Sequence, residues 1–437
     1  MQVLRAALVA ADPYRAVVAA LTDDARAAQI LASIPAIGKV FVVGAGKAGA
    51  AMSRAVEAVL GERIASGLVI VKDGYAETGG APLARITLRE ASHPLPDGRS
   101  VGATAELLYL VDSAGAHDLV ICLISGGGSA LLTQPAAGIA LEDVQSVTGL
   151  LLKAGATINE LNAVRKHLSQ VSGGQLARAA RPARVLSLIL SDVTGSPLDV
   201  IASGPTVPDP TTYADALAIL ARYNLLTRVP ANVRTHLEAG MAGRLSETPK
   251  PTDPLFDAVT NILVADNVQA VEAAAVKSRA LGFNTVIVST SLEGEARKVG
   301  ATIANMAREV VEQGKPLPLP GCLLFGGETT VTVRGDGVGG RNTEMALSAA
   351  LHLRGLGPRV MMASLATDGG DGSSPSAGGL VDGTTIERGD RLGLDARAFL
   401  DNNDSYTYLD RVGDAIMTGP TGTNVNDIMG LFILDNS

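Results

Sequence analysis

Several short apolar runs of this chain end in glycine-rich turns that also carry a charged or hydroxyl side chain. In the N-terminal half, Gly44–Gly49 contains Lys47, Ser125–Ser129 begins and ends with serine, and Ser191–Gly195 contains Asp192. Open α/β sheets bind ligands at the carboxyl ends of their strands, where glycine lets backbone N–H groups approach an anion. These turns therefore predict phosphate binding.

The C-terminal half repeats this arrangement after two further apolar runs. Gly326–Glu328 follows one run, and Thr367–Gly372, with its two aspartates, follows the other. A third glycine turn opens a helical run and contains Arg341, which is suited to clamp a carboxylate or a developing phosphoryl charge through two hydrogen bonds. Glu328 and Arg334 are weaker candidates, for which a structural role is favoured.

Lys47 is the most telling residue of the first turn. The turn matches G-x-G-x-x-G, but a cation at a helix N-terminus opposes the helix dipole unless an anion is bound there. This favours a lysine that faces an anion over a dinucleotide loop, for which Asp73 is the only, loosely spaced, ribose-binding acid. A packing turn with a solvated Lys47 is the alternative.

The other candidates carry alternatives of their own. Asp192 is placed to hold Mg²⁺ against phosphate oxygens, or to form a local turn. The Ser125–Ser129 turn lacks the Lys-Ser/Thr ending of a P-loop and the pattern of a nucleophile elbow. The consecutive cations of 165–167 are interpreted as a solvated helical face, and His93 as a hydrogen-bonded structural group.

Composition sets the class of protein. The chain has 437 residues and a net charge of −8, which argues against nucleic-acid binding. Cys122 and Cys322 lie inside apolar runs and are expected to be buried thiols, with a disulfide as the minor alternative. No apolar stretch has the length of a membrane helix, so we expect a cytoplasmic protein without membrane partners; a homodimer is left open.

Alternating strand and helix patterns predict an α/β protein with a mostly parallel sheet. A helix is expected after Gly49, and a helical segment over 159–180, bent at its glycine pair. The β-branched alternation of Thr329–Arg334 predicts a strand. The Pro-rich, polar stretch 243–256 is the expected linker between two domains.

Taken together, these segments resemble the class II glycerate 2-kinase family, two-domain proteins with a C-terminal MOFRL domain, also known as hydroxypyruvate reductases. The resemblance runs in order along nearly the whole chain and is weakest between Ala214 and Pro320. The matching segments are VGAGKAG (43–49), SHPLPDGRS (92–100), LISGGGSALL (123–132), NAVRKHLS (162–169), LSDVTGSPLDVIASGPTVPD (190–209), GGETTVTVRGDGVGGRNTE (326–344), TDGGDGSSPSAG (367–378) and TGTNVNDI (421–428).

The resemblance implies ATP-dependent phosphorylation of D-glycerate at its 2-hydroxyl. It also implies a Rossmann-like domain, residues 1–245, and a smaller α/β domain, residues 246–437, with the active site in a cleft between them. Lys47 and Arg341 correspond to the family's lysine and arginine and are expected to neutralise the phosphoryl group and the glycerate carboxylate, while the general base is not identified.

Asp192 completes the expected catalytic set as the Mg²⁺ ligand. Two alternatives stay open: an NAD(P)H-dependent hydroxypyruvate reductase, which rests on the G-x-G-x-x-G turn, and a non-catalytic sensor of sugar phosphates. The residues expected to bind ATP are Ser125, Gly126, Gly127, Gly128, Ser129, Gly195, Gly326, Gly327, Glu328, Asp368 and Gly369.

Overall fold

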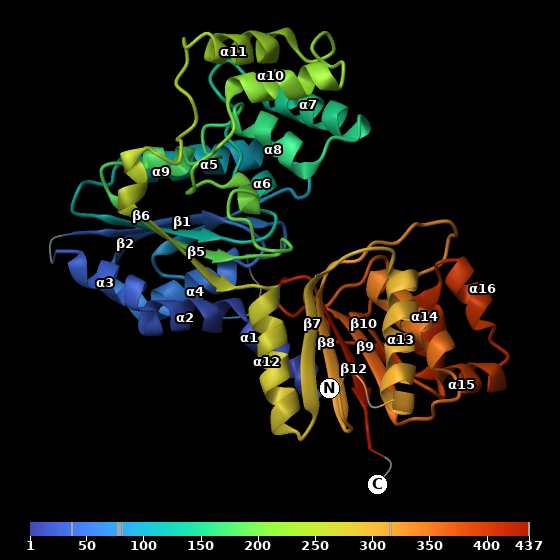
Figure 1. Ribbon diagram of the computed structural model, residues 1–437. Coiled ribbons are helices and arrows are strands. Elements are labelled where there is room, and N and C mark those ends of the chain that lie inside the picture. Colours follow the sequence, from blue (N-terminus) through green and yellow to red (C-terminus); the bar gives the residue numbers. More distant parts are fainter. Residues whose placement is uncertain (36–37, 77–79, 81, 314, 316, 436–437) are drawn as a thin grey trace. The chain divides into compact units, whose positions relative to one another are not determined.

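The computed structural model describes residues 1–35, 38–76, 80, 82–313, 315 and 317–435, and it divides into two compact units (Figure 1). Pro13–Val264 form the N-terminal unit, and Met1–Asp12 with Ala265–Ser437 form the C-terminal unit. The division falls beyond residue 245 because the Pro-rich stretch packs inside the N-terminal unit. There Thr248 is buried and donates a hydrogen bond to Asp209 Oδ2 at 3.0 Å.

A six-stranded sheet in the order β3-β2-β1-β4-β5-β6 forms the centre of the N-terminal unit. The pairs β1–β2, β1–β4, β2–β3 and β4–β5 are parallel, which confirms the predicted alternation of strands and helices. β1 and β4 are buried along their whole length, as expected for strands that are covered on both faces. The strands are β1 (Val40–Ala45), β2 (Ile64–Lys72), β3 (Ile86–Ala91), β4 (Leu119–Ile124), β5 (Arg184–Leu190) and β6 (Val259–Ala265).

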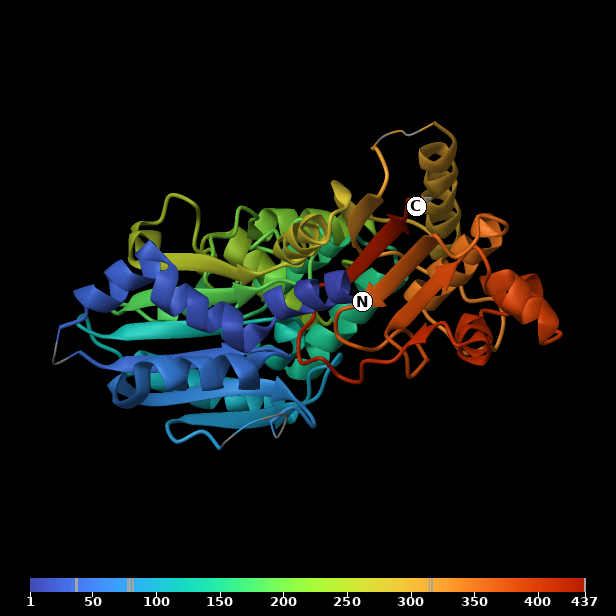
Figure 2. The same ribbon diagram turned by 90° about the horizontal axis from the view of Figure 1, so that it is seen from below.

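Helices cover both faces of this sheet (Figures 1 and 2). α2 (Pro13–Asp23), α3 (Ala25–Ser33) and α4 (Gly49–Leu60) lie on one face, and α5 (Gly98–Asp112), α6 (Gly128–Leu131) and α9 (Gln175–Ala179) lie on the other. A further layer has its own apolar core and contains α7 (Leu141–Lys153), α8 (Ile158–Lys166), α10 (Tyr213–Arg222) and α11 (Ala231–Met241). Three short 3₁₀ helices are η1 (Gly61–Arg63), η2 (Ile201–Ser203) and η3 (Pro254–Ala258).

Local sequence explains where several of these helices begin and end. α4 follows the first glycine turn and ends at Leu60, before Gly61, as predicted. α8 begins with a capping box in which Thr157 and Glu160 satisfy each other's backbone N–H groups. The helical segment predicted over 159–180 is interrupted more widely than expected, because residues 167–174 are not helical and α9 begins only after Gly174.

The sheet of the C-terminal unit is mixed, in the order β11-β10-β9-β12-β8-β7. β12 runs antiparallel to β8 and to β9 and lies between them. Its first residue, Asp427, therefore pairs with Gly327 at the end of β8 and with Ala366 at the end of β9. The strands are β7 (Asn284–Leu292), β8 (Gly321–Gly327), β9 (Val360–Ala366), β10 (Gly378–Asp382), β11 (Ala415–Ile416) and β12 (Asp427–Ile433).

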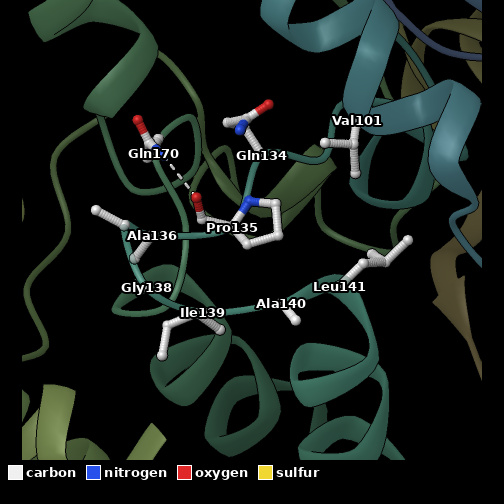
Figure 3. A pocket seen from close by; sticks show the side chains of 10 residues that line it. Val101, Gln134, Pro135, Ala136, Gly138, Ile139, Ala140, Leu141 and Gln170 are labelled. Carbon is white, nitrogen blue, oxygen red and sulfur yellow. Dashed lines mark hydrogen bonds between the residues drawn. The ribbon is translucent and has the colours of Figure 1, made fainter. Parts of the chain in front are cut away.

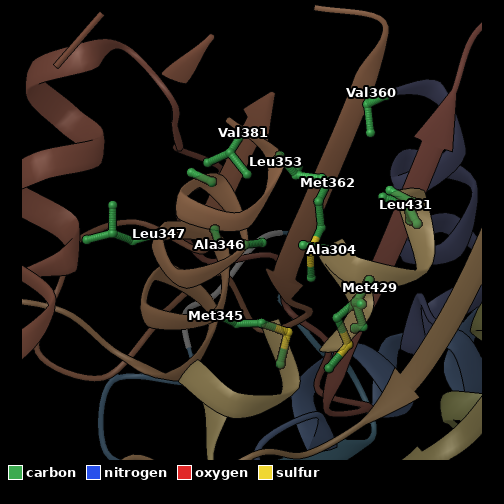
Figure 4. Packing of buried hydrophobic residues seen from close by; sticks show 14 of the residues in the cluster. Ala304, Met345, Ala346, Leu347, Leu353, Val360, Met362, Val381, Met429 and Leu431 are labelled. Carbon is green, nitrogen blue, oxygen red and sulfur yellow. The ribbon is translucent and has the colours of Figure 1, made fainter. Parts of the chain in front are cut away.

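An apolar core joins this sheet to α13 (Ala296–Gln313) and α14 (Arg341–Leu353), which pack side by side (Figure 4). Met345 and Ala346 of α14 meet Met362 of β9 and Met429 of β12 in this core. The helices of the unit are α1 (Gln2–Ala10), α12 (Asn267–Ala280), α13 (Ala296–Gln313), α14 (Arg341–Leu353), α15 (Thr385–Arg391), α16 (Ala396–Asp401) and α17 (Ser405–Val412), and α1 packs on α12.

The strand predicted over Thr329–Arg334 is wrong. Only Thr330 forms an isolated bridge, because side chains take the backbone N–H groups that a strand would use: Glu295 accepts from Thr332, and Asn403 accepts from Arg334. The two cysteines are buried free thiols, as predicted, and the disulfide alternative is wrong. None of the described helices combines the length and hydropathy that crossing a bilayer requires.

Candidate functional site

Two of the predicted turns meet in the N-terminal unit, because β1 and β4 are neighbours in the sheet. The strand order reverses between them, and in α/β sheets this is where ligands bind. Lys47 N donates a hydrogen bond to Gly126 O at 2.9 Å, and Ala48 N donates one to Ser125 Oγ at 3.1 Å. The lysine turn and the Ser125–Ser129 turn are thus held together by hydrogen bonds.

Asp192, which follows β5, packs directly against the same turn. A β-carbon added at Gly126 would lie 1.9 Å from Asp192 Oδ2, so any larger residue would have to displace the carboxylate. Gly127 has φ +84°, and a β-carbon on it would lie 3.2 Å from His93 Nε2 and 3.5 Å from Lys47 Cγ. The structure therefore brings together Lys47, Asp192 and the Ser125–Ser129 turn.

Lys47 carries the charge of this site. Its side chain is partly buried, and no carboxylate of the described residues forms an ion pair with its ammonium group. Burial lowers the pKa of the neighbouring His93, and the charges of Lys47 and Lys72 lower it further, so the imidazole is neutral at pH 7. The side chains beside the turn therefore offer a cation for an anionic ligand and a neutral proton acceptor.

The far end of the turn is fixed by buried polar contacts. Ser129 Oγ lies 2.9 Å from Ser203 Oγ, which also donates to Asn162 Oδ1 of α8 at 3.3 Å. Ala202 and Ser203 both adopt the left-handed backbone region, which costs non-glycine residues about 1–3 kcal/mol each and is common at ligand sites. Gly195 is exposed, with open space around it.

The interpretation of residues 165–167 as a solvated face is wrong. Lys166 and His167 are buried, and Arg165 is partly buried. Arg165 Nη2 donates a hydrogen bond to Ser129 O at 3.0 Å, which places this arginine at the glycine turn. Sequence reasoning missed it because helical spacing shows that three consecutive residues point in different directions, but not which of them point inward.

A second cluster forms in the C-terminal unit around Arg341, the first residue of α14. Its Nε lies 2.6 Å from Asp427 Oδ2, its Nη2 lies 3.0 Å from Asp427 Oδ1, and its Nη1 lies 3.0 Å from Glu328 Oε1. Asp371 caps the start of α14 by accepting from the N–H groups of Asn342 and Thr343. The ends of β8 and β9 and the start of β12 thus surround one arginine with carboxylates.

Burial sets the electrostatics of this cluster. The side chain of Asp427 is 0% exposed, and burial raises the pKa of Asp427 to about 6, although Arg341 opposes the rise. Burial also disfavours the charge of Arg341, but Asp427, with Glu328 and Asp371, raises the pKa of Arg341 above its usual value. Sequence reasoning missed Asp427; the only signal was the TGTNVNDI segment that ends at β12.

The other residues of this unit that were predicted to bind ATP are either closely packed or exposed to solvent. A β-carbon at Gly326 would meet Asn267 Oδ1 at 1.8 Å, and Gly327 packs against the backbone of Leu292. Asp368 is exposed, and Gly369 next to it packs against the backbone of Gly419. The two glycines of β8 have packing reasons for being glycine, whereas Asp368 is open to a ligand.

The described residues contain no cluster of three or more His, Cys, Asp or Glu side chains that could hold a metal ion. Mg²⁺ does not need such a cluster, because it commonly keeps several waters and binds one or two carboxylates and the phosphates of a substrate. Asp192 beside the glycine turn suits that second arrangement.

A separate hollow of about 360 Å³ lies in the N-terminal unit (Figure 3). None of its lining residues is charged, and none belongs to the predicted site. Gln170 Nε2 donates to Pro135 O at 2.6 Å across one side of it. Its chemistry does not suit a phosphate. The lining residues are Val101, Gln134, Pro135, Ala136, Ala137, Gly138, Ile139, Ala140, Leu141 and Gln170.

The acid that a dinucleotide site would need is engaged elsewhere. Asp73 follows β2, but Arg99 donates to both of its carboxylate oxygens, at 2.6 and 2.8 Å. A ribose hydroxyl at this position would have to compete with a two-bond ion pair.

Comparison with known proteins gives two family matches and close relatives. Residues 1–238 match a domain of unknown function, DUF4147, and residues 321–427 match the MOFRL family. A glycerate 2-kinase of Pyrococcus horikoshii is 45% identical, over 97% of this chain and 94% of its own length. A putative hydroxypyruvate reductase of Agrobacterium vitis is 44% identical, over 99% of this chain and 94% of its own.

A solved structure extends the similarity to the fold. The crystal structure of a glycerate kinase from Thermotoga maritima superposes with a TM-score of 0.89 at 41% identity, covering 99% of this chain and 98% of that one. Both sheets of the present chain, with their helices, therefore have counterparts in a protein whose three-dimensional structure is known.

Proposed function

Because the chain belongs to the glycerate 2-kinase family, with its DUF4147 and MOFRL domains, we propose that it transfers the γ-phosphoryl group of ATP to the 2-hydroxyl of D-glycerate. The products are 2-phospho-D-glycerate and ADP. The observation that carries the proposal is the position of Lys47: at the switch point of the sheet, beside a glycine turn, with no carboxylate of the described residues paired to it.

Phosphoryl transfer needs positioning and charge stabilisation more than covalent chemistry from the protein. In the proposed reaction, Lys47 neutralises charge that develops on the transferring phosphoryl group. The N–H groups of Ser125–Ser129 are assigned to phosphate oxygens of ATP. The turn that contains Asp368, in the C-terminal unit, is assigned separately to nucleotide binding. Gly195, in the exposed turn after β5, is also assigned to nucleotide binding.

Asp192 is the residue that we propose to bind Mg²⁺, directly or through water. The metal, when bound, supplies positive charge against the phosphate oxygens. Asp192 supports this role through its position, because its carboxylate presses against Gly126 in the turn that binds phosphate in our proposal. Other divalent ions with the same preference for oxygen ligands fit the same carboxylate.

Arg341 is the second proposed catalytic cation. It lies at the N-terminus of α14, which adds a partial positive charge. Asp427 and Glu328 hold its guanidinium in one orientation, so that part of its charge is already neutralised. We therefore propose that Arg341 stabilises negative charge that develops in the transition state, rather than binding an anion tightly in the ground state.

A cytoplasmic location and a homodimer stay predictions.

A product assay tests the function. Purified protein is incubated with D-glycerate, ATP and Mg²⁺, and the phosphoglycerate is identified by ³¹P NMR, with the Lys47→Ala variant as the control for contaminating kinases. A 2-phosphoglycerate signal supports the proposal, and 3-phosphoglycerate would contradict the assigned hydroxyl. Oxidation of NADH by hydroxypyruvate without any phosphoglycerate would favour the reductase instead, and binding without turnover would favour the sensor.

A further inference from the structure

The three consecutive basic residues Arg165, Lys166 and His167, at the end of α8, have different surroundings. The ammonium group of Lys166, whose side chain is 3% exposed, lies 3.6 Å from carboxylate oxygens of Asp199 and Asp209. His167 Nε2 lies 3.1 Å from Glu247 Oε2. Lys166 and His167 therefore both have acidic neighbours inside the N-terminal unit.

Arg165 is the exception. Its Nη2 donates a hydrogen bond to the carbonyl oxygen of Ser129 at 3.0 Å, and no carboxylate of the described residues lies within 4.0 Å as an ion-pair partner. Burial lowers the pKa of Arg165, with no acidic neighbour to offset it. A partly buried guanidinium without a counter-ion is unfavourable, and an anionic ligand would supply the missing negative charge.

The surroundings keep Arg165 in place. It lies three residues after Asn162 on α8, so both side chains share a face of the helix. Asn162 accepts a hydrogen bond from Ser203, which contacts Ser129. The same helix face thus contacts the glycine turn through two separate polar links, and the guanidinium is oriented before any ligand arrives.

We propose that Arg165 and the Ser125–Ser129 turn form an anion-binding subsite that takes an oxyanion group of the reactants. This inference rests on the proposed function, in which the oxyanion is either the carboxylate of D-glycerate or a phosphate of ATP. Arg341 suits this task less well, because all three of its guanidinium nitrogens already contact carboxylate oxygens. Arg165 retains donors that can form two parallel bonds to an oxyanion.

The test compares Arg165→Met and Arg165→Lys with the wild-type protein. Arg234→Met, on the exposed side of α11, is the matched control for loss of an arginine. Isothermal titration measures the affinity for D-glycerate and, separately, for a non-hydrolysable ATP analogue with Mg²⁺. Thermal unfolding with and without inorganic phosphate reports both folding and binding of a simple anion.

We expect Arg165→Met to weaken the binding of one reactant by about 10- to 100-fold, with the KM for that reactant rising in parallel. Loss of glycerate affinity identifies the carboxylate, and loss of nucleotide affinity identifies the phosphate. Arg165→Lys recovers part of the affinity. The melting temperature without ligand changes little, because removal of an uncompensated charge offsets loss of the bond to Ser129 O. The rise in melting temperature on adding phosphate becomes smaller.

Unchanged affinity for both reactants in a folded Arg165→Met protein would overturn the subsite. So would a lower melting temperature with unchanged phosphate stabilisation, which indicates a packing role. The proposed function fails separately: if the wild-type protein makes no phosphoglycerate, but Arg165→Met still loses affinity for one of the two compounds, the subsite stands and the kinase assignment does not.

Discussion

Arg341 and Asp427 form a two-bond ion pair between residues 86 positions apart in the chain, at distances of 2.6 and 3.0 Å. Antiparallel β12 makes the pair possible, because its first residue lies beside the ends of β8 and β9. Since Asp427 is fully buried, the pair fixes the guanidinium more firmly than an exposed ion pair would. Because Arg341 is the first residue of α14, the pair connects the start of this helix to the edge of the sheet. We propose that this arginine is catalytic.

Arg341→Lys tests whether the geometry of this pair matters in addition to its charge. A lysine keeps the charge but cannot reproduce the two parallel bonds to Asp427. We expect kcat to fall by about 10²–10³-fold while the protein remains folded. Steady-state kinetics and circular dichroism check this, and Arg354→Lys, at an exposed ion pair with Asp390, is the control. An unaltered kcat would remove Arg341 from the catalytic set.

The pKa of Asp427 predicts a particular dependence on pH. It is about 6 in the folded protein and near 3.9 in an unfolded chain, so the native state binds more protons between these values. The contribution of this group to the unfolding free energy therefore falls as pH rises from about 4 to 6, by roughly 1–3 kcal/mol. Denaturant titrations should show this slope in the wild-type protein and a flatter one in Asp427→Asn.

Activity should respond to the same proton in the opposite direction. Below pH 6, Asp427 becomes neutral and its ionic hold on Arg341 weakens, so we expect kcat to decline on the acidic side. The decline should be missing from the pH profile of Asp427→Asn, whose kcat is lower throughout. An identical acidic limb in both proteins would assign it to another group.

Lys47→Ala tests the lysine of the first turn. If its ammonium group stabilises the transferring phosphoryl group, kcat falls by about 10²–10³-fold with little change in KM. Stability should change little, because the ammonium has no ion-pair partner among the described residues. Lys153→Ala, at the exposed end of α7, is the control. A raised KM with normal kcat would reduce Lys47 to a binding residue.

Sequence patterns were enough to predict the features that depend on residues close together in the chain. The turns after β1, β4 and β5 follow buried apolar runs, so their position at one sheet edge was predictable. Asp427 and Arg165 were missed because their importance arises from distant contacts and from burial, which spacing does not reveal. The Thr329–Arg334 strand failed for a related reason: Glu295 and Asn403, far apart in sequence, bind its N–H groups.

Asp192→Asn tests the metal assignment. Amide substitution keeps the shape of the side chain but removes the charge that Mg²⁺ prefers. We expect the Mg²⁺ concentration for half-maximal activity to rise by about tenfold or more. Asp112→Asn, at the exposed end of α5, is the control. A Mg²⁺ titration that matches the wild type would exclude Asp192 as a ligand.

Gly126→Ala tests whether the close approach of the turn and Asp192 is needed. The new methyl group would lie 1.9 Å from Asp192 Oδ2, so the carboxylate or the turn has to move. We expect a loss of about 1–3 kcal/mol in unfolding free energy and a fall in kcat, because the displaced turn also holds Lys47 through its backbone bond.

The matched control for that change is Gly149→Ala in α7. Gly149 lies in the middle of a helix, and a β-carbon there would meet nothing within 4 Å. Alanine should stabilise the helix by about 0.5–1 kcal/mol and leave kcat unchanged. Thermal unfolding and initial rates of both variants separate the two cases. If Gly126→Ala behaved like Gly149→Ala, the turn would have room for a side chain, and its proposed contact with a phosphate would lose its structural reason.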